Sequence, residues 1–163
     1  MGDGRYDTRY DPRYDPRAPE AEKPRPFAEL PPPPEDVVPS GEMYDWYIRG
    51  LDLLQGGDAQ AAVALLSHTS QAEPESRMVR EALARAQFDV GLYEEAHVNF
   101  SWIIEVNPAD DYAQFGLGLA ATKVGDLEGA VEHLALAAAM RPDIGYYGTA
   151  LRGAKAALTA ARR

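Results

Sequence analysis

Side chains that could carry chemistry occur throughout this chain of 163 residues, but they do not gather into a motif. Cysteine is absent, which removes thiolate nucleophiles, thiolate metal ligands and disulfides. The three histidines, His68, His97 and His133, occupy different places in the repeat described below and show no paired spacing of the kind that binds zinc. We therefore expect no metal site and no cofactor.

Two pairs of neighbouring carboxylates, Glu94-Glu95 and Asp110-Asp111, are the other candidates for acid–base chemistry. Both pairs fall where helices are expected to begin, and a carboxylate there caps free backbone N–H groups or interacts favourably with the helix dipole. No glycine-rich phosphate loop follows a predicted strand. We therefore expect no catalytic residues and interpret the protein as a non-enzyme.

Charge and hydropathy argue against two classes of partner. The formal net charge is −10, with 9 acids and 6 bases in residues 1–40 and 17 acids and 10 bases in residues 41–163. Neither part offers the basic surface that nucleic acid phosphates require. No apolar run approaches the roughly 18 residues of a membrane span, and the N-terminus has no apolar core. We expect no membrane insertion and a cytoplasmic location, and the alanine- and glycine-rich composition fits a bacterial protein.

The feature that organises the chain is a period of 34 residues. This step relates Pro74, Pro108 and Pro142, Gly57, Gly91 and Gly125, and Ala62, Ala96 and Ala130. Units starting at Met43, Arg77 and Asp111 align without a gap over 102 residues, as repeats 43–76, 77–110 and 111–144. A fixed period of this length predicts one supersecondary unit that is used three times and stacked.

Each repeat predicts two helices followed by a stop. The eighth place holds Gly50, Ala84 and Gly118, and the 24th place holds Leu66, Phe100 and Leu134. Small residues recur where two helix backbones approach closely, and the bulky residues of the 24th place face the packed side of the second helix. The proline that ends each unit prevents the second helix from continuing.

These places resemble the tetratricopeptide repeat family, whose pattern has small residues at the eighth and twentieth places, an aromatic residue or leucine at the 24th and proline at the 32nd. The resemblance implies an all-α, right-handed solenoid of three helix-turn-helix repeats. Three places depart from the family pattern. Arg49 replaces the usual leucine, and Arg80 and Gln114 replace the first aromatic residue, which only Trp46 keeps.

The turn residues place seven helices. They are expected at about Glu42–Gln55, Ala59–Gln71, Glu75–Asp89, Tyr93–Val106, Asp110–Lys123, Leu127–Met140 and Asp143–Ala160. At Gly57-Asp58 and Gly125-Asp126 a glycine ends one helix and an aspartate caps the next. The last helix leaves the 34-residue pattern and carries alanine on one side and charge on the other, which predicts a capping helix.

A change of composition near Ser40-Gly41 marks a domain boundary, because ten of the 13 prolines lie in residues 1–40. This arm repeats Arg-Tyr-Asp three times, from Arg5, Arg9 and Arg13, and contains a proline run at Pro31–Pro34. Its composition predicts disorder. Two interpretations stay open, a solvated spacer and a short linear motif whose arginines, tyrosines or prolines contact an aromatic surface. Residues 41–163 form the repeat domain.

The resemblance to the tetratricopeptide repeat family also implies a concave groove, formed by the first helix of each repeat. The residues that it places there are Tyr44, Tyr47, Leu51, Met78, Glu81, Arg85, Phe88, Tyr112, Phe115, Leu119 and Lys123. They predict an apolar and aromatic groove with a central charged pair, suited to a partner peptide or helix. Alternatively, individual members of this set only pack between helices.

Some members of the family hold the C-terminal carboxylate of heat-shock chaperones in a clamp of basic and asparagine side chains. The matching places here are Tyr47, Leu51, Ala82, Tyr112 and Gly116, and none is Lys, Arg or Asn. That class of partner is disfavoured. The sequence therefore predicts a non-catalytic protein-interaction module, a scaffold or adaptor with an unidentified protein or peptide partner. The alternative is a self-associating protein, a homo-oligomer whose groove binds the arm or terminal helix of another copy.

Overall fold

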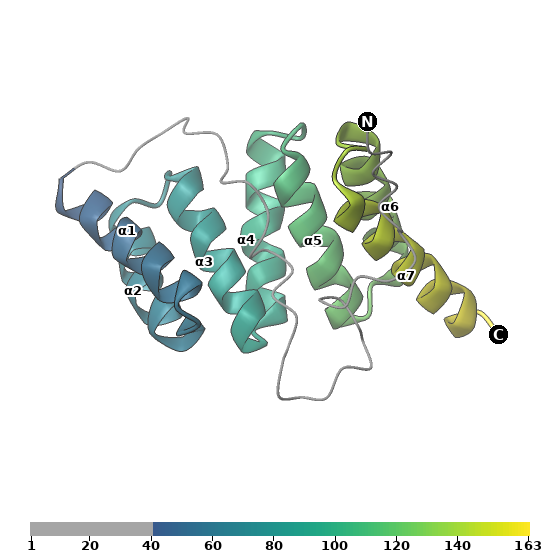
Figure 1. Ribbon diagram of the computed structural model, residues 1–163, viewed down its shortest axis with the longest axis horizontal. Helices are drawn as coiled ribbons and strands as arrows, with labels where there is room; N and C mark the ends of the chain where they lie inside the picture. Colours follow the sequence, from purple (N-terminus) through teal and green to yellow (C-terminus); the bar gives the residue numbers. More distant parts are fainter. Residues whose placement is uncertain (1–40) are drawn as a thin grey trace, which may run out of the picture.

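The structure, a computed structural model, describes residues 41–163, and the arm that the sequence predicts to be disordered, residues 1–40, lies outside the described residues. Seven helices fill the described part (Figure 1). They are α1 (Glu42–Gln55), α2 (Ala59–Ala72), α3 (Arg77–Val90), α4 (Tyr93–Val106), α5 (Asp111–Val124), α6 (Leu127–Met140) and α7 (Gly145–Ala161). The prediction of an all-α fold is confirmed.

Local capping chemistry decides where these helices begin and end. Asp58 and Asp126 each accept a hydrogen bond from the backbone N–H three residues later, at 3.1 and 3.0 Å. The preceding glycines, Gly57 and Gly125, have φ of 89° and 90°, a left-handed conformation that glycine adopts without steric cost. The predicted joints at both places are confirmed.

Helices α3, α5 and α7 start one or two residues later than the sequence suggested, α7 at Gly145 rather than Asp143. We expected the third helix from about Glu75, but α3 begins at Arg77 because the Ser76 hydroxyl accepts a hydrogen bond from the Val79 N–H at 3.4 Å and acts as the N-cap. In the same way, Asp110 lies outside α5 and caps it, rather than forming its first residue.

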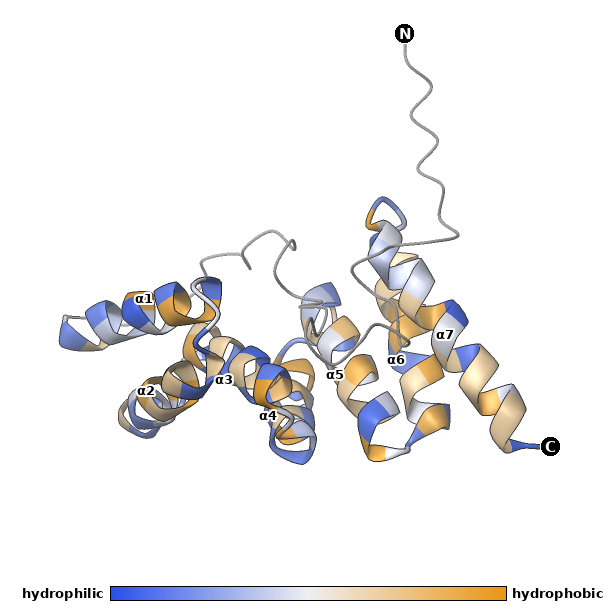
Figure 2. Cartoon of the chain, turned by 60° about the horizontal axis from the view of Figure 1, so that its bottom comes forward, coloured by the Kyte–Doolittle hydropathy of each residue, from blue (hydrophilic) through white to orange (hydrophobic). Residues whose placement is uncertain are grey.

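The helices form a curved array of two layers (Figure 1). The odd-numbered helices contact one another in order, from α1 to α3, α5 and α7, while no contact joins α2 to α4 or α4 to α6. In a curved array of two layers, neighbouring helices are closer together in the inner layer than in the outer one. The odd-numbered helices, which contact one another, therefore form the inner, concave side. We call the surface made by α1, α3, α5 and α7 the inner face. Hydrophilic and hydrophobic residues alternate around α1 and α2, as expected of helices with one buried side (Figure 2).

Matched small and large residues hold the two layers together. A Cβ atom added at Gly118 would lie 2.5 Å from Leu134 Cγ, and one added at Gly50 would lie 2.5 Å from Leu66 Cδ2. Both leucines are almost completely buried. The eighth place is therefore small because the leucine of the 24th place fills the space beside it.

The residues that depart from the family pattern at the fourth place have a packing role. Arg80 lies over the Trp102 ring at 4.2 Å and donates a hydrogen bond to the Pro74 carbonyl at 2.9 Å. Gln114 makes the equivalent bond, to the Pro108 carbonyl at 3.0 Å. Each of these side chains ties its helix to the proline of the preceding repeat through a hydrogen bond to the proline carbonyl.

The third departure, Arg49, does not prevent the first repeat from packing. Its side chain is exposed, whereas the next residue, Gly50, is buried against α2. Helix α1 contacts both α2 and α3. A guanidinium that reaches solvent costs the interior nothing, so the first repeat keeps the geometry of the others.

Candidate functional site

The residues predicted for the groove lie on α1, α3 and α5, the first helix of each repeat, and these helices form the inner layer of the array. Their exposure differs from what an open apolar groove would show. Buried members are Tyr47, Met78, Glu81, Phe88, Tyr112, Phe115 and Leu119; Leu51 and Arg85 are half-buried, and Tyr44 and Lys123 are exposed. The apolar members therefore pack into the core, and Tyr44 is the exposed one.

The third repeat shows why an inner aromatic residue becomes buried. The Phe115 ring stacks on Tyr147 of α7, with ring centroids 4.6 Å apart and an interplanar angle of 28°. The Tyr147 hydroxyl donates a hydrogen bond to Asp111 Oδ2 at 2.8 Å, which ties α7 to the start of α5. The capping helix thus covers the inner end of the third repeat with an aromatic stack and a polar bond.

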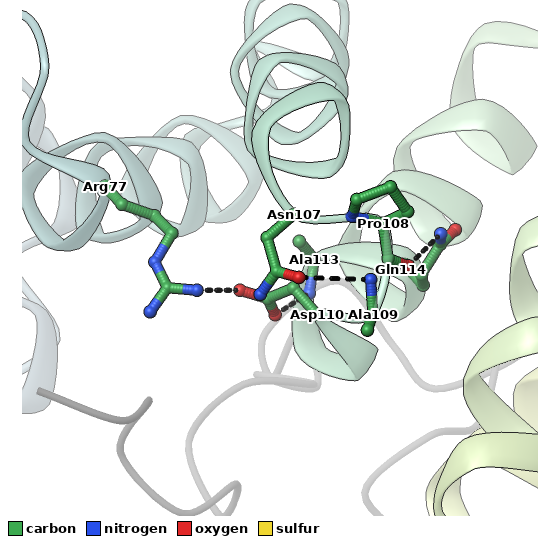
Figure 3. A network of polar contacts seen from close by, with 7 residues as sticks. All are labelled: Arg77, Asn107, Pro108, Ala109, Asp110, Ala113 and Gln114. Carbon is green, nitrogen blue, oxygen red and sulfur yellow. Dashed lines mark hydrogen bonds and ion pairs between the residues drawn. The ribbon is translucent and has the colours of Figure 1, made fainter. Parts of the chain in front are cut away.

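A buried ion pair joins α3, the first helix of the second repeat, to the N-cap of α5, the first helix of the third repeat. Arg77 Nη1, at the start of α3, donates to Asp110 Oδ2 at 3.1 Å, and both side chains are about nine-tenths buried or more. Asp110 Oδ1 accepts a second hydrogen bond from the Ala113 N–H at 3.0 Å. Figure 3 shows Arg77 reaching across to Asp110 where α5 begins, so that one carboxylate caps a helix and binds the preceding repeat.

Glu81 lies one helical turn after Arg77 and is the most deeply buried carboxylate of the described residues, with 2% exposure. Among these residues no hydrogen bond or ion pair reaches its carboxyl group, because Arg77 pairs with Asp110. Burial, and then the nearby Asp110 carboxylate, raises the pKa of Glu81 to about 8. At neutral pH this carboxyl group is therefore largely protonated, unless a cation approaches it.

Arg85 lies one further turn along α3 and points toward the third repeat. Its guanidinium carbon is 6.0 Å from the centroid of the Tyr112 ring, at the outer limit of a cation–π contact. Tyr112 is buried, and burial raises the pKa of its hydroxyl well above the usual range. The predicted central charged pair, Glu81 and Arg85, is thus close to an aromatic residue of the next repeat.

Comparisons with known proteins agree with this arrangement at the level of the fold. No protein-family model matches the chain, and no curated protein matches its sequence. Solved structures do match. The tetratricopeptide-repeat domain of Sgt2 from Aspergillus fumigatus superposes with a TM-score of 0.69 at 21% identity, covering 80% of this chain and 87% of that one.

Two further structures have the same architecture. The first tetratricopeptide-repeat domain of Spaghetti (RPAP3), bound to the HSP90 peptide SRMEEVD, gives a TM-score of 0.68 at 19% identity and covers 75% of this chain and 97% of that one. MamA from Desulfovibrio magneticus RS-1 gives 0.68 at 23% identity, covering 72% and 66% of the two chains. This chain has the tetratricopeptide-repeat fold.

In this tetratricopeptide-repeat array, the places that correspond to a carboxylate clamp have little room for one. Ala82 is buried. A Cβ atom added at Gly116 would collide with the end of the Phe100 ring, which is itself fully buried. Since Phe100 cannot withdraw without disturbing the core, a longer basic side chain at Gly116 would require the second and third repeats to separate.

The polar cluster at the joint of the second and third repeats was not anticipated from the sequence. Arg77 and Asp110 stand 33 residues apart, at the first and last places of one repeat, so they meet only because successive repeats stack. The contact of Asp111 with Tyr147 spans 36 residues in the same way. The sequence did carry one signal for this ion pair: opposite charges stand at the first and last places of the repeat, as Arg77 and Asp110.

Two of the histidines considered above for metal binding make packing or hydrogen-bond contacts within the fold. His68 packs against Trp46, with ring centroids 4.7 Å apart, and His133 Nδ1 lies 2.8 Å from Gln114 Oε1. Within residues 41–163, no group of three or more His, Cys, Asp or Glu side chains could hold a metal ion. In the same part of the chain, no helix combines the length and hydropathy needed to cross a bilayer.

Proposed function

We propose that this tetratricopeptide-repeat array is a non-catalytic protein-interaction module, a scaffold or adaptor, that binds a peptide or helix of a partner along its inner face. The observation that carries the proposal is that the first helices of three successive repeats form one inner face, on which Tyr44 and Lys123 are exposed and Leu51 and Arg85 are half-buried. The same three helices carry a row of buried aromatic side chains, Tyr47, Phe88, Tyr112 and Phe115, and Arg85 lies near Tyr112.

The chemistry of this row suits a short segment of protein. Aromatic side chains supply large contact areas at low conformational entropy and dominate the energetics of many interfaces. Arg85 carries a positive charge, and Glu81, one helical turn before it, becomes negative when a cation approaches, so the two favour one direction and one register of a bound segment. A partner side chain is expected to pack against Tyr44 and Leu51, the more accessible apolar side chains, while its polar neighbours pair with Glu81 and Arg85.

The expected ligand differs from those of two similar structures. The first and second domains of RPAP3 are bound to peptides of HSP90 and HSP70 that end in Glu-Glu-Val-Asp. In this chain Leu51, Ala82 and Gly116 stand at clamp places and offer no cation to a terminal carboxylate. We therefore expect no measurable binding of the peptide SRMEEVD.

The test is selection of peptides from a random display library against the immobilised full chain, followed by affinity measurement with the enriched peptides. Variants must spare the core, because a charge at Tyr47 or Phe115, which are 4% and 1% exposed, would unfold the protein. The informative variant is Leu51→Ser with Arg85→Ser, since both side chains are half-buried on the inner face. Val98→Ser with Glu105→Ser, on the outer helix α4, is the matched control.

Loss of an inner-face anchor typically weakens binding by about tenfold or more. We expect that loss for the inner variant and no change for the outer control, with helical circular dichroism retained in both. Undiminished binding by a folded inner variant would place the binding surface elsewhere, and a selection that enriches no peptide would contradict the proposal as a whole.

A further inference from the structure

The first helix of a repeat packs against the second helix of the preceding repeat through its third, sixth and tenth places. A Cβ atom added at Gly116, the sixth place of α5, would meet the Phe100 ring of α4. All residues at these places of α3 and α5 are buried: Val79, Ala82 and Ala86, and Ala113, Gly116 and Ala120. This side of a first helix is therefore normally covered by another helix.

The same side of α1 is open. Among the described residues α1 contacts only α2 and α3, so no helix precedes it in the array. Its third, sixth and tenth places hold Asp45, Ile48 and Asp52, and all three side chains are exposed. Arg49, also exposed, stands at the seventh place, where α3 and α5 carry a buried leucine. The departure from the family pattern at Arg49 thus falls on this open face.

Helix α7 leaves an open face at the other end of the array. It contacts only α5 and α6 among the described helices, and its buried residues are Tyr147, Ala150 and Ala154. Since an α-helix turns by 3.6 residues, the opposite side of α7 faces away from the array. The exposed residues of that side include Lys155, Ala156, Thr159 and Arg163.

The two open faces carry opposite charges. Helix α1 contains three acids and one base, whereas residues 145–163 contain four bases and no acid. In the part of the chain that the structure describes, no ion pair involves Asp45, Asp52, Lys155 or Arg163. One end of the array is therefore complementary in charge to the other end of a second copy.

The spacing of these charges also matches. Asp45 and Asp52 are seven residues apart and Lys155 and Arg163 are eight apart, which corresponds to about 10.5 and 12 Å along a helix. Between the two acids lies Ile48, which is 36% exposed. Between the two bases lie the small residues Ala156 and Thr159. The isoleucine can pack against these small residues while an ion pair forms on either side of it.

We propose that copies of this chain associate head to tail, with the open face of α1 docked on the open face of α7 of a second copy. The docked helix covers the side of α1 that a preceding second helix covers in α3 and α5. Because the two surfaces differ, the contact is heterologous and extends to rows of copies instead of closing at a dimer. The inference goes beyond the interaction module proposed above, since it uses the ends of the array and leaves the inner face available.

Sedimentation velocity of the full chain tests the association. A contact between two single helices is small, so we expect association at concentrations of about 10–1,000 µM. The average sedimentation coefficient should rise with concentration past the value of a dimer, and less so in about 0.5 M NaCl, which screens exposed ion pairs. A coefficient that stays at the monomer value would overturn the proposal. A plateau at the dimer value would also overturn it, because it indicates a closed contact between identical surfaces.

An exchange of charge between the ends identifies the surfaces. One variant carries Asp45→Lys with Asp52→Lys, and the other carries Lys155→Glu with Arg163→Glu. Each variant alone should stay monomeric, because the charges that face each other then have the same sign. An equimolar mixture should associate again, since each variant offers one end that is complementary to the other variant. A mixture that stays monomeric, with helical circular dichroism retained in both variants, would contradict the proposal.

A matched control separates the end faces from the effect of overall charge. Glu94→Lys with Glu105→Lys, at two exposed places of α4, changes the net charge by the same amount as the α1 variant. The control should associate like the wild type. If it loses association as the α1 variant does, overall charge is responsible and the proposal is wrong.

Disulfide trapping locates the contact. The chain has no cysteine, so Ile48→Cys and Ala156→Cys each introduce a single thiol. We expect the mixed variants to form an interchain disulfide at least about tenfold faster than either variant alone, because docking brings the two Cβ atoms within disulfide reach. Equal rates in the mixture and in the separate variants would show that these two faces do not meet.

Discussion

Helices α1 and α5 occupy the same place in the first and third repeats, yet they differ strongly in burial. In α1 three residues are buried, Tyr47, Gly50 and Leu54. In α5 every residue from Tyr112 to Ala121 is buried, which covers the full circumference of the helix. Both helices are 14 residues long and carry glycine at the eighth place.

The number of neighbours accounts for the contrast. Helix α1 contacts α2 and α3, whereas α5 contacts α3, α4, α6 and also the capping helix α7. The buried apolar residues accordingly form two clusters, a smaller one around α1, α2 and α3 and a larger one from α3 to α7. A repeat pattern therefore sets which residues face a neighbour, and the position in the array sets how many neighbours exist.

The largest expected effect compares Leu134→Ala with Leu66→Ala, the same change at the 24th place of the third and first repeats. Both side chains are 0–1% exposed. We expect a loss of about 3–5 kcal/mol for Leu134, and of about 2–3 kcal/mol for Leu66, because the end of the array can collapse into the cavity. Urea unfolding measures both values. An equal or larger loss for Leu66 would break the comparison between the two ends.

The middle repeat sharpens the comparison, because its fifth place holds Glu81 where α1 and α5 hold Tyr47 and Phe115. The pKa of Glu81 is raised to about 8 in the folded protein, from 4.5, so between these values the folded state binds a proton that the unfolded state lacks. The free energy of unfolding should therefore fall as the pH rises from 5 to 8.

We expect this fall to be on the order of 2 kcal/mol, and Glu81→Gln to remove most of it, since a neutral amide does not titrate. Chemical unfolding at a series of pH values measures the slope. Asp126→Asn, which changes an exposed carboxylate at a helix cap, serves as the control and should keep the slope of the wild type. A Glu81→Gln protein with an unchanged slope would show that another group is responsible.

Gly118→Ala and Gly50→Ala compare close helix approach in the interior and at the end. At Gly118 the new methyl group would meet the Leu134 side chain and also its backbone nitrogen, at 3.1 Å, whereas at Gly50 it meets only the Leu66 side chain. Overpacking destabilises both variants, and the higher helix propensity of alanine offsets part of that cost. We expect the free energy of unfolding to fall by about 1–2 kcal/mol for Gly118→Ala and by about 0–1 kcal/mol for Gly50→Ala. Thermal unfolding that ranks them in the opposite order would contradict this account.

The smallest effect concerns the C-terminal end, where Arg162 Nη2 of the final turn contacts Glu128 Oε1 of α6 at 2.6 Å. Both side chains are largely exposed, and ion pairs in water contribute little. Glu128→Gln should change the free energy of unfolding by less than about 0.5 kcal/mol. A larger loss in urea unfolding would indicate that this pair, rather than the apolar contacts of α7, holds the capping helix.

Much of the fold could be predicted from the sequence because its signals are local. Gly57, Asp58 and Pro74 act on their own backbone, and so the helix ends were placed to within two residues at most. The groove residues were assigned to the first helix of each repeat for the same reason, since a fixed period carries the geometry of one repeat to the next, and that they form a binding groove stays a prediction. What the period did not predict was their burial, which depends on contacts such as that of Phe115 with Tyr147.

By itself the sequence determined the register of three repeats and the seven helices, because backbone capping and helical periodicity act within a few residues. Only the tertiary structure decided that Arg77 meets Asp110, that Arg80 and Gln114 bind the proline of the preceding repeat, and that Glu81 is left buried without a hydrogen-bond partner among residues 41–163. These contacts join residues of different helices, so stacking had to bring them together.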